Sequence, residues 1–462
     1  MHQNWSYRII MFSINPQSDL ALTMNFLSKL GIISTLSLLI SQVGFAQEWP
    51  QFRGEQGTAT TSTQLPTQWT PENYKWKTPL PGKGWSSPVY ADGVAWMTSA
   101  TDEKADPEAI KKKLEGVEFA QIKTASASVT FYALCVDLET GKLLHEIELG
   151  KSTDTQPINP MNSYASPTPV IADGKVVCHF GNYGTWCLDA KTGKEIWKTE
   201  YDINHSVGPG SSPIVVGGNV ILVCDGYDQQ FLAAVDLETG KQAWKTNRPP
   251  INADNGEFKK SYCTPIVRDV DGQQQAIVTG ANWICGYNPV NGEEIWRLNY
   301  GDGYSITGMP AIIDGMLVFV TGYNYNQFVG CDPRGKGELK VDKSVKWKQR
   351  GAPAMSSFVV HNGLIYAAGD RGVFTVHDPQ DGNLLTRFRT IGNMSSSPLL
   401  AAEHLYLGNR DGQFVVIKIG EELEVVHEFD FGAGIYASPC PIDNDLLVRT
   451  ADELIRISND YP

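Results

Sequence analysis

Hydroxyl and aromatic side chains recur just before a series of regularly spaced prolines, and they are the residues of this chain best suited to binding. Hydroxyl groups both donate and accept hydrogen bonds, and aromatic rings stack on planar groups. Gathered around one opening, they would suit a polar or planar ligand. Serine before proline also simply fits a crowded channel, and that structural alternative stays open. The candidates for the mouth of such a channel are Trp85, Ser86, Tyr164, Ser211, Tyr262, Met355, Ser396, Tyr436 and His205.

The most visible carboxylates belong to a repeated turn, which reads CVDLETGKLLH from Cys135 and AVDLETGKQAW from Ala234. An Asp or Asn at its start accepts hydrogen bonds from backbone N–H groups of the turn, and the glycine that follows supplies positive φ. The Trp that ends the motif is expected on an outer strand, packed against the next repeat. We therefore assign these residues a structural docking role and identify no catalytic residue. The docking set is Asp137, Asp189, Asp236, Asn288, Asp378, Trp197, Trp244 and Trp296.

The eight cysteines form no C-x-x-C pair, and the histidines show no H-E-x-x-H spacing, so we expect no sequence-local metal site. In VVCHFGNYGTWCLD, a two-residue turn at Asn182 and Tyr183 would set Cys178 opposite Cys187. A disulfide between them is then an expectation for an exported protein. Other registers separate the two thiols, which would make both small buried hydrophobic residues.

One unit recurs eight times: an anchor residue, three further residues, a turn pair and a strand. The spacings between anchors are 40 to 52 residues, except for a first spacing of 81. This period is typical of four-stranded propeller blades, so we predict an all-β fold, an eight-bladed β-propeller of four-stranded antiparallel blades. The anchors are Pro88, Pro169, Pro213, Pro265, Pro310, Phe358, Pro398 and Pro439.

The long first spacing predicts an insertion at residues 102–127 in the first blade, with a short helix beginning near Pro107. The last unit lacks an outer strand, and Tyr74–Leu80 (YKWKTPL) resembles the missing one. Because a closed ring has no exposed sheet edge, we expect this N-terminal strand to complete the last blade. The propeller is thus expected over residues 74–462, after an N-terminal extension at 47–73.

Residues 1–46 are expected to be a signal peptide, with Met24 an alternative start. After Met24 come Lys29, an apolar run over 30–40 and small residues before a cut near Ala46. The run is short for a membrane span, and no Cys lies at the cut for lipidation. We therefore expect a periplasmic or secreted monomer of bacterial origin with no stable membrane span after cleavage.

The formal net charge of −13 disfavours nucleic acid as a partner, because phosphate binding needs clustered Lys and Arg. A partner protein or a small polar ligand is the expectation that remains.

The pattern A-x-D-x-x-T-G-K-x-x-W resembles the tryptophan-docking repeat of the PQQ-like (quinoprotein alcohol dehydrogenase-like and BamB-like) β-propeller family. For an enzyme the resemblance implies a quinone cofactor, PQQ, with calcium. The chain has neither the adjacent Cys pair nor the C-x-x-C-H haem segment expected of many such enzymes. We therefore expect a non-catalytic ligand- or protein-binding scaffold without cofactor. The alternatives are a PQQ-dependent dehydrogenase oxidising an alcohol or sugar, and a BamB-like outer-membrane protein assembly factor.

Overall fold

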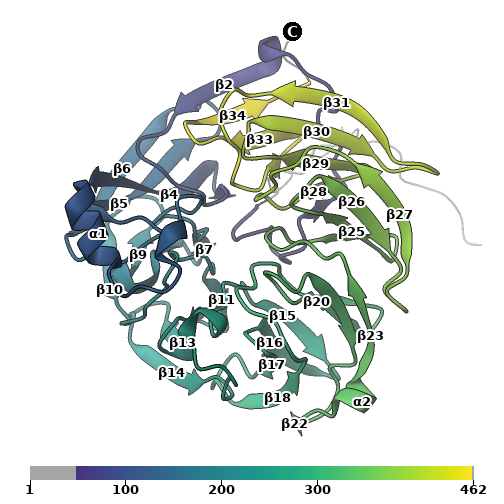
Figure 1. Ribbon diagram of the computed structural model, residues 1–462. Coiled ribbons are helices and arrows are strands. Elements are labelled where there is room, and N and C mark those ends of the chain that lie inside the picture. The colour runs from purple at the N-terminus through teal and green to yellow at the C-terminus, as the bar shows by residue number, and fades with distance from the viewer. Residues whose placement is uncertain (1–47, 460–462) are drawn as a thin grey trace, which may run out of the picture. The chain divides into compact units, whose positions relative to one another are not determined.

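The computed structural model describes residues 48–459, which lie within one compact unit, Ala46–Pro462. The expected signal peptide falls outside these residues. Eight small antiparallel sheets are arranged radially around a central axis (Figure 1). The predicted eight-bladed β-propeller is therefore confirmed. No helix in residues 48–459 is long and apolar enough to cross a membrane.

Each blade has four strands, which follow one another from the axis outward. The first four blades are β3 (Val89–Ala91), β4 (Val94–Lys104), β5 (Ser126–Asp137), β6 (Leu143–Ser152); β7 (Val170–Ala172), β8 (Lys175–His179), β9 (Thr185–Asp189), β10 (Glu195–Thr199); β11 (Ile214–Val216), β12 (Asn219–Asp225), β13 (Gln230–Asp236), β14 (Gln242–Asn247); and β15 (Ile266–Val270), β16 (Gln273–Thr279), β17 (Trp283–Tyr287), β18 (Glu294–Asn299). The last four are β19 (Ala311–Ile313), β20 (Met316–Val320), β21 (Gln327–Cys331), β23 (Val345–Arg350); β24 (Val359–His361), β25 (Leu364–Ala368), β26 (Val373–His377), β27 (Leu384–Arg389); β28 (Leu399–Ala401), β29 (His404–Gly408), β30 (Gln413–Lys418), β31 (Glu424–Asp430); and β32 (Cys440–Ile442), β33 (Asp445–Arg449), β34 (Glu453–Ile457), β2 (Tyr74–Pro79).

Two short strands extend these sheets, and a few short helices lie between the strands. The two strands run parallel to their neighbours: β1 (Thr60–Thr61) pairs with β28, and β22 (Gly337–Glu338) pairs with β18. The helices are α1 (Pro107–Leu114), α2 (Val341–Ser344) and the 3-10 turns Pro71–Asn73, Ala120–Ile122, Gly181–Tyr183 and Gly256–Phe258.

Each anchor residue found in the sequence immediately precedes the innermost strand of its blade, Pro88 before β3 and Phe358 before β24 for example. The turn pair that follows takes left-handed backbone angles. In the first blade φ is 49° at Asp92 and 78° at Gly93. Tight two-residue hairpins need positive φ at both central residues, which Asp, Asn and Gly tolerate best. The turn chemistry of the sequence thus fixes the inner hairpin of the blade.

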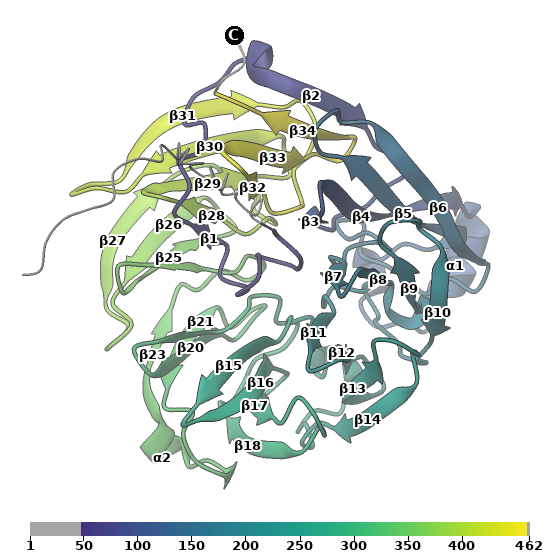
Figure 2. The ribbon, with the colours of Figure 1, turned by 180° about the vertical axis from the view of Figure 1, so that it is seen from behind.

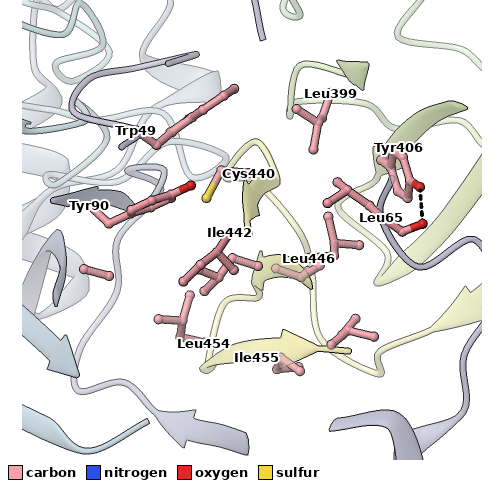
Figure 3. Close-up of a cluster of buried hydrophobic side chains, with 14 of the residues drawn as sticks. Trp49, Leu65, Tyr90, Leu399, Tyr406, Cys440, Ile442, Leu446, Leu454 and Ile455 are labelled. Carbon is pink, nitrogen blue, oxygen red and sulfur yellow. Dashed lines mark hydrogen bonds between the residues drawn. The ribbon is translucent and has the colours of Figure 1, made fainter. Parts of the chain in front are cut away.

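The last blade is closed by the N-terminal strand. β2 pairs antiparallel with β34, so that Lys77 lies opposite Ile455. The seam is covered by an apolar cluster that includes Trp49, Tyr90 and Ile442 (Figure 3). In the same cluster the Tyr406 hydroxyl donates to the Leu65 carbonyl at 3.3 Å. The first and last parts of the propeller therefore share one core.

The docking motif joins neighbouring blades. In the turn after β13, the Asp236 carboxylate accepts from the Thr239 N–H at 2.8 Å and from its hydroxyl at 2.7 Å. The indole N–H of Trp197, in the preceding blade, donates to the Leu237 carbonyl of the same turn at 2.8 Å. The carboxylate therefore orders the turn that the indole covers. Asp137, Asp189, Asn288 and Asp378 likewise accept backbone N–H groups within their turns.

The indoles divide into those that reach the next blade and one that does not. Trp244 donates to the Pro289 carbonyl of the following turn at 3.2 Å. Trp296 instead donates to Gln275 Oε1 of its own blade at 2.7 Å, although its ring packs in an apolar cluster shared with the fifth blade. Trp76 of β2 and Trp347 of β23, which were not among the predicted docking residues, donate to the Leu138 and Pro379 carbonyls.

The expected Cys178–Cys187 disulfide is not formed, because the strand register differs from the expected one. The connection is a 3-10 turn at Gly181–Tyr183, and Cys178 pairs with Trp186 whereas Cys187 pairs with Val177. A shift of one residue turns a side chain to the other face of a sheet. The two thiols accordingly lie in different apolar clusters, and all eight cysteines are free and buried.

Residues 48–61 run across the back of the ring, on the face opposite α1 (Figures 1 and 2). The Ile171 N–H of the second blade donates to the Pro50 carbonyl at 2.7 Å, and the Leu400 N–H of the seventh donates to the Ala59 carbonyl at 2.9 Å. Between them, buried Arg53 donates from Nη2 to the Phe358 carbonyl of the sixth blade at 2.7 Å. This back segment, residues 48–61, therefore bridges blades on opposite sides of the axis.

The first blade carries the expected helix, and its flanking strands are unusually long. α1 begins after Asp106, whose carboxylate caps it by accepting the Ala109 N–H at 2.9 Å. The strands β4 and β5 continue to Lys104 and from Ser126, so the chain between them lies at one end of the blade. The insertion is thereby held over the front of the ring.

Candidate binding site

A ring of hydroxyl groups surrounds the axis at the residue just before seven of the eight anchors. The Ser438 N–H donates to Ser87 Oγ at 3.0 Å, the Ser87 N–H to Thr168 Oγ1 at 2.9 Å, and the Thr168 N–H to Ser212 Oγ at 2.9 Å. Each of these blades thus donates a backbone N–H to the hydroxyl of the next blade. The other bonds of the ring join Ser212 to Thr264, Met309 to Ser357, Ser357 to Ser397, and Ser397 to Ser438.

The ring has one gap, between Thr264 and Met309, because methionine has no hydroxyl to accept the next N–H. The Met309 side chain is buried and points to the back segment, where its methyl group lies 3.0 Å from the place a Cβ on Gly57 would take. A repeated backbone position therefore serves two purposes here. It links blades through hydroxyls, and in the fifth blade it packs against residues 48–61.

The ring hydroxyls line a cavity of about 580 Å³, which we call the front cavity because Phe119 and Ile122 of the insertion also line it. Phe52 of the back segment forms part of its wall, so the channel is covered from behind. Each ring hydroxyl accepts one N–H, and within residues 48–459 we find no acceptor for its own O–H. The wall of the cavity is therefore rich in hydrogen-bond donors that a ligand can use.

The structure places the sequence-predicted channel residues in two groups. Trp85, Tyr262, Met355 and Tyr436 line the cavity. The other five lie behind the wall, which corrects the expectation for them. They are Ser86, Ser211, Ser396, Tyr164 and His205.

The serines in the second group fail to reach the cavity because neighbouring residues of an extended strand point to opposite sides. Ser211 Oγ donates to the Cys263 carbonyl of the next blade at 3.0 Å, and Ser396 Oγ donates to the Gly408 carbonyl at 2.6 Å. Ser86 Oγ accepts from buried Arg449 at 2.6 Å. These hydroxyls hold the inner strands together, and the residue one step closer to the anchor lines the cavity.

A buried ion cluster stands at the cavity wall and was not found from the sequence. Lys123, from the insertion, donates from Nζ to Glu257 Oε1 and to Ser206 Oγ, both at 2.7 Å. Lys260 donates from Nζ to the other oxygen, Glu257 Oε2. All three charged residues are buried, yet Glu257 and Lys260 line the cavity. No spacing in the sequence links Lys123 to the loop before the fourth blade, so only the folded chain reveals this cluster.

Burial and hydrogen bonding oppose each other in the titration of this cluster. Burial alone would raise the pKa of Glu257, but hydrogen bonds from Lys123, Lys260 and Ser206 lower it overall, so the carboxylate is ionised. Burial lowers the pKa of Lys260, and its pairing with Glu257 opposes that shift. Nearby His205 is neutral, since burial lowers its pKa to about 4.

Exposed and half-buried aromatic side chains form what we call the aromatic rim, Phe119, Phe258, Tyr304, Tyr323 and Tyr325. Phe119, Tyr304 and Tyr323 line the cavity, and the other two contact them. They touch edge to face: the ring centroids of Phe119 and Phe258 are 6.4 Å apart, and those of Phe258 and Tyr304 are 4.9 Å apart. Tyr304 in turn contacts Tyr323 and Tyr325. Such pairs contribute beyond their buried area, so the rim is a built surface that joins the insertion to the fifth blade.

The cavity does not fit the calcium-bound quinone that the family resemblance implies for an enzyme. Calcium takes six to eight oxygen ligands, several of them carboxylate. Glu257 is the one carboxylate among the cavity-lining residues, and two ammonium groups and a hydroxyl already occupy it. Across residues 48–459, moreover, no three His, Cys, Asp or Glu side chains gather as a metal site.

Comparison with protein families gives matches over residues 70–246 and 131–352 to a family described as outer membrane protein assembly factor BamB. Together these matches cover more than half of the chain. An outer membrane protein assembly factor BamB from Burkholderia pseudomallei is 23% identical over 329 residues, which make up 62% of this chain and 82% of that protein.

Dehydrogenases are also similar, over a shorter stretch. The quinoprotein alcohol dehydrogenase PedH of Pseudomonas putida is 29% identical over 146 residues, 29% of this chain and 23% of that enzyme. The chain thus matches only about a quarter of the length of this relative. Among solved structures, a europium-containing methanol dehydrogenase superposes with a TM-score of 0.61 at 14% identity, covering 89% of this chain and 98% of that one. At this identity the likeness shows a shared fold.

Proposed function

Because the chain belongs to the PQQ-like β-propeller repeat family whose model is described as outer membrane protein assembly factor BamB, we propose that it is a non-catalytic binding scaffold. It presents the front cavity and the aromatic rim to a partner. We place it in the periplasm or outside the cell, as a monomer without PQQ or calcium. The signal-like segment at residues 1–46 motivates that location.

The observation that carries this proposal is the state of Glu257. A dehydrogenase needs a base that can take a proton from its substrate. The carboxylate of Glu257 accepts from Lys123, Lys260 and Ser206, which lower its pKa. A carboxylate so engaged is a poor base, whereas the donors around it suit binding. This geometry supports a scaffold over a hydride-abstracting enzyme.

The extent of the similarity favours a protein partner. The match to the BamB of Burkholderia pseudomallei spans most of that protein, while the match to PedH spans less than a quarter of the enzyme. A role in outer-membrane protein assembly, as in the name of the first relative, is therefore our second candidate. It is a specific form of the binding function.

Two measurements test the proposal. Purified protein is incubated with PQQ and calcium and assayed for dye-coupled oxidation of methanol, ethanol and glucose; we expect no turnover above a sample without protein. Turnover with one quinone bound per chain would disprove the scaffold. The same protein, immobilised, is mixed with purified outer-membrane assembly components of its source organism. Retention that Phe258→Ser weakens and Leu385→Ser does not would support the second candidate, and no retention would dismiss it.

A further inference from the structure

The ion cluster leaves one positive charge uncompensated at the cavity. Lys123 and Lys260 are only 7% and 2% exposed, and within residues 48–459 Glu257 is the one carboxylate that forms an ion pair with either of them. Two ammonium groups against one carboxylate give a local surplus of a single positive charge. The chain as a whole carries −13, so this surplus runs against its general character. Because a buried unpaired charge is costly, the site favours an anionic ligand.

The unused donors point the same way. Lys260 has three N–H donors, and within residues 48–459 its Nζ bonds only to Glu257 Oε2. The ring hydroxyls of Ser212 and Thr264 also line the cavity, and each accepts an N–H while keeping its own O–H free within the described chain. A carboxylate offers only acceptors and carries one negative charge. It matches the surplus better than a phosphate, which carries nearly two.

The aromatic rim shows that the ligand continues outside the cavity. Twelve large hydrophobic side chains are exposed in the described part of the chain; four of them line this cavity, and two more contact aromatic residues that line it. These six are Phe119, Ile122, Met161, Phe258, Tyr323 and Tyr325. Clustered exposed apolar groups mark interaction sites. A small molecule held inside the cavity would leave these side chains uncovered.

We propose that the cavity receives a carboxylate of an extended peptide segment from a partner protein, with apolar side chains of that segment covering the aromatic rim. The inference rests on the proposed function and names its ligand class. The carboxylate comes from the end of the peptide chain or from an Asp or Glu side chain. Lys260 and the ring hydroxyls bind the charge, and Phe258 and its neighbours bind the apolar residues.

Calorimetric titration of the full chain with three N-acetylated peptides tests this. The first, Ser-Leu-Phe-Ser-Leu, has a free C-terminal acid; the second is the amide of Ser-Leu-Phe-Glu-Leu; the third is the amide of Ser-Leu-Phe-Ser-Leu. We expect one acidic peptide to bind at least tenfold more tightly than the neutral amide. Preference for the first identifies a chain end and for the second a side chain. A protein that binds all three equally, or none, overturns the inference.

Matched variants test whether the charged cluster causes the preference for an acidic peptide. Lys260→Met leaves the Lys123–Glu257 pair neutral, so it should abolish the preference for the acidic peptide. Lys259→Met removes the same charge one residue away, outside the cavity lining, and should keep it. If Lys260→Met does not fold, Lys123→Met removes the surplus charge from the other side. Equal behaviour of the cavity variant and the Lys259→Met control would overturn the role of the cluster.

The rim has its own control. Phe258→Ser should weaken all peptides about tenfold and preserve the acid preference, while Leu385→Ser, an exposed apolar residue on β27, should change nothing. Benzoate that binds as tightly as the peptides and ignores Phe258→Ser would overturn the peptide as occupant. Inorganic phosphate that displaces the acidic peptide at equal concentration would overturn the carboxylate.

The outcomes separate this inference from the proposed function. If peptides bind without a preference for the acid while retention of the partner depends on Phe258, the inference is wrong and the proposed scaffold function is still supported. Quinone-dependent turnover would remove the scaffold whatever the peptides do.

Discussion

The indole ring of Trp85 stacks on the phenol ring of Tyr436, with 3.8 Å between ring centroids and 5° between ring planes. Trp85 precedes the first blade and Tyr436 the last, and both line the cavity. The seam at which the ring closes is therefore part of the site.

Trp76→Ala should open the closure. The Trp76 indole donates to the Leu138 carbonyl at 3.0 Å and covers Gly141 of the first blade. Removing a large, partly buried aromatic side chain should lower the free energy of unfolding by about 3 kcal/mol. Urea denaturation measures it. Lys75→Ala on the same strand breaks only an exposed pair with Glu139 and should cost below about 1 kcal/mol. Equal losses would contradict the docking role.

Ser397→Ala should weaken the hydroxyl ring. Its Oγ accepts the Ser357 N–H at 2.9 Å, and an orphaned buried N–H costs about 1–3 kcal/mol. Ser395, two residues away, also lines the cavity, but its buried hydroxyl has no partner in the described residues. Ser395→Ala should therefore leave the denaturation midpoint unchanged or raise it. A ring serine that behaves like Ser395 would show that the inter-blade bonds add nothing.

Gly240→Ala should disturb the contact between the second and third blades. A Cβ there would lie 2.6 Å from the Trp197 ring, and φ is 68°. Gly218 has φ of 78° with nothing near its Cβ position, so Gly218→Ala isolates the cost of left-handed backbone, about 1–2 kcal/mol. We expect Gly240→Ala to cost about 1–3 kcal/mol more, from overpacking. Thermal unfolding of both variants measures the difference, and similar melting temperatures would contradict it.

Glu257→Gln should be strongly destabilising. It leaves Lys123 and Lys260 buried together without their shared counter-charge, and breaking a buried pair costs about 3–5 kcal/mol. Glu238→Gln removes an exposed carboxylate that pairs with Lys175 and should cost below about 1 kcal/mol. Guanidinium denaturation compares them. A small loss for Glu257→Gln would mean that the cluster is solvated and carries no surplus charge into the site.

Stability should fall on mild acidification. Burial lowers the pKa of His205 to about 4 and that of His179 to about 3, from an ordinary value of 6.5. The unfolded chain therefore binds more protons than the folded chain below pH 6.5. The contribution is fully present above that pH and is lost progressively as pH falls toward about 4. His205→Asn should flatten the decline between about pH 6.5 and pH 4, measured by denaturation; an unchanged slope would contradict burial of a neutral ring.

The sequence alone was enough to predict the structure of a single blade, because that structure depends on local interactions. Prolines such as Pro88 mark the start of the inner strand, Asp92 and Gly93 form its hairpin, and Asp236 orders the docking turn. Each depends on residues a few positions apart. The eightfold repeat of that pattern, and an N-terminal strand able to close the ring, followed from the same reading.

The site was decided by the tertiary structure. Pattern alone placed Ser86 and Ser211 in the channel and could not separate them from the adjacent Ser87 and Ser212. Because successive side chains of an extended strand point to opposite sides, only Ser87 and Ser212 line the cavity. The pattern also set Cys178 opposite Cys187, where a one-residue difference in register separates them. Lys123 contacts Glu257 only because the folded propeller brings the insertion of the first blade next to the loop before the fourth blade. Short-range hydrogen bonds and turn angles depend on residues close together in the sequence, so the sequence predicts them. Which side of a strand a side chain faces, and which distant charges meet, is decided only when the blades pack.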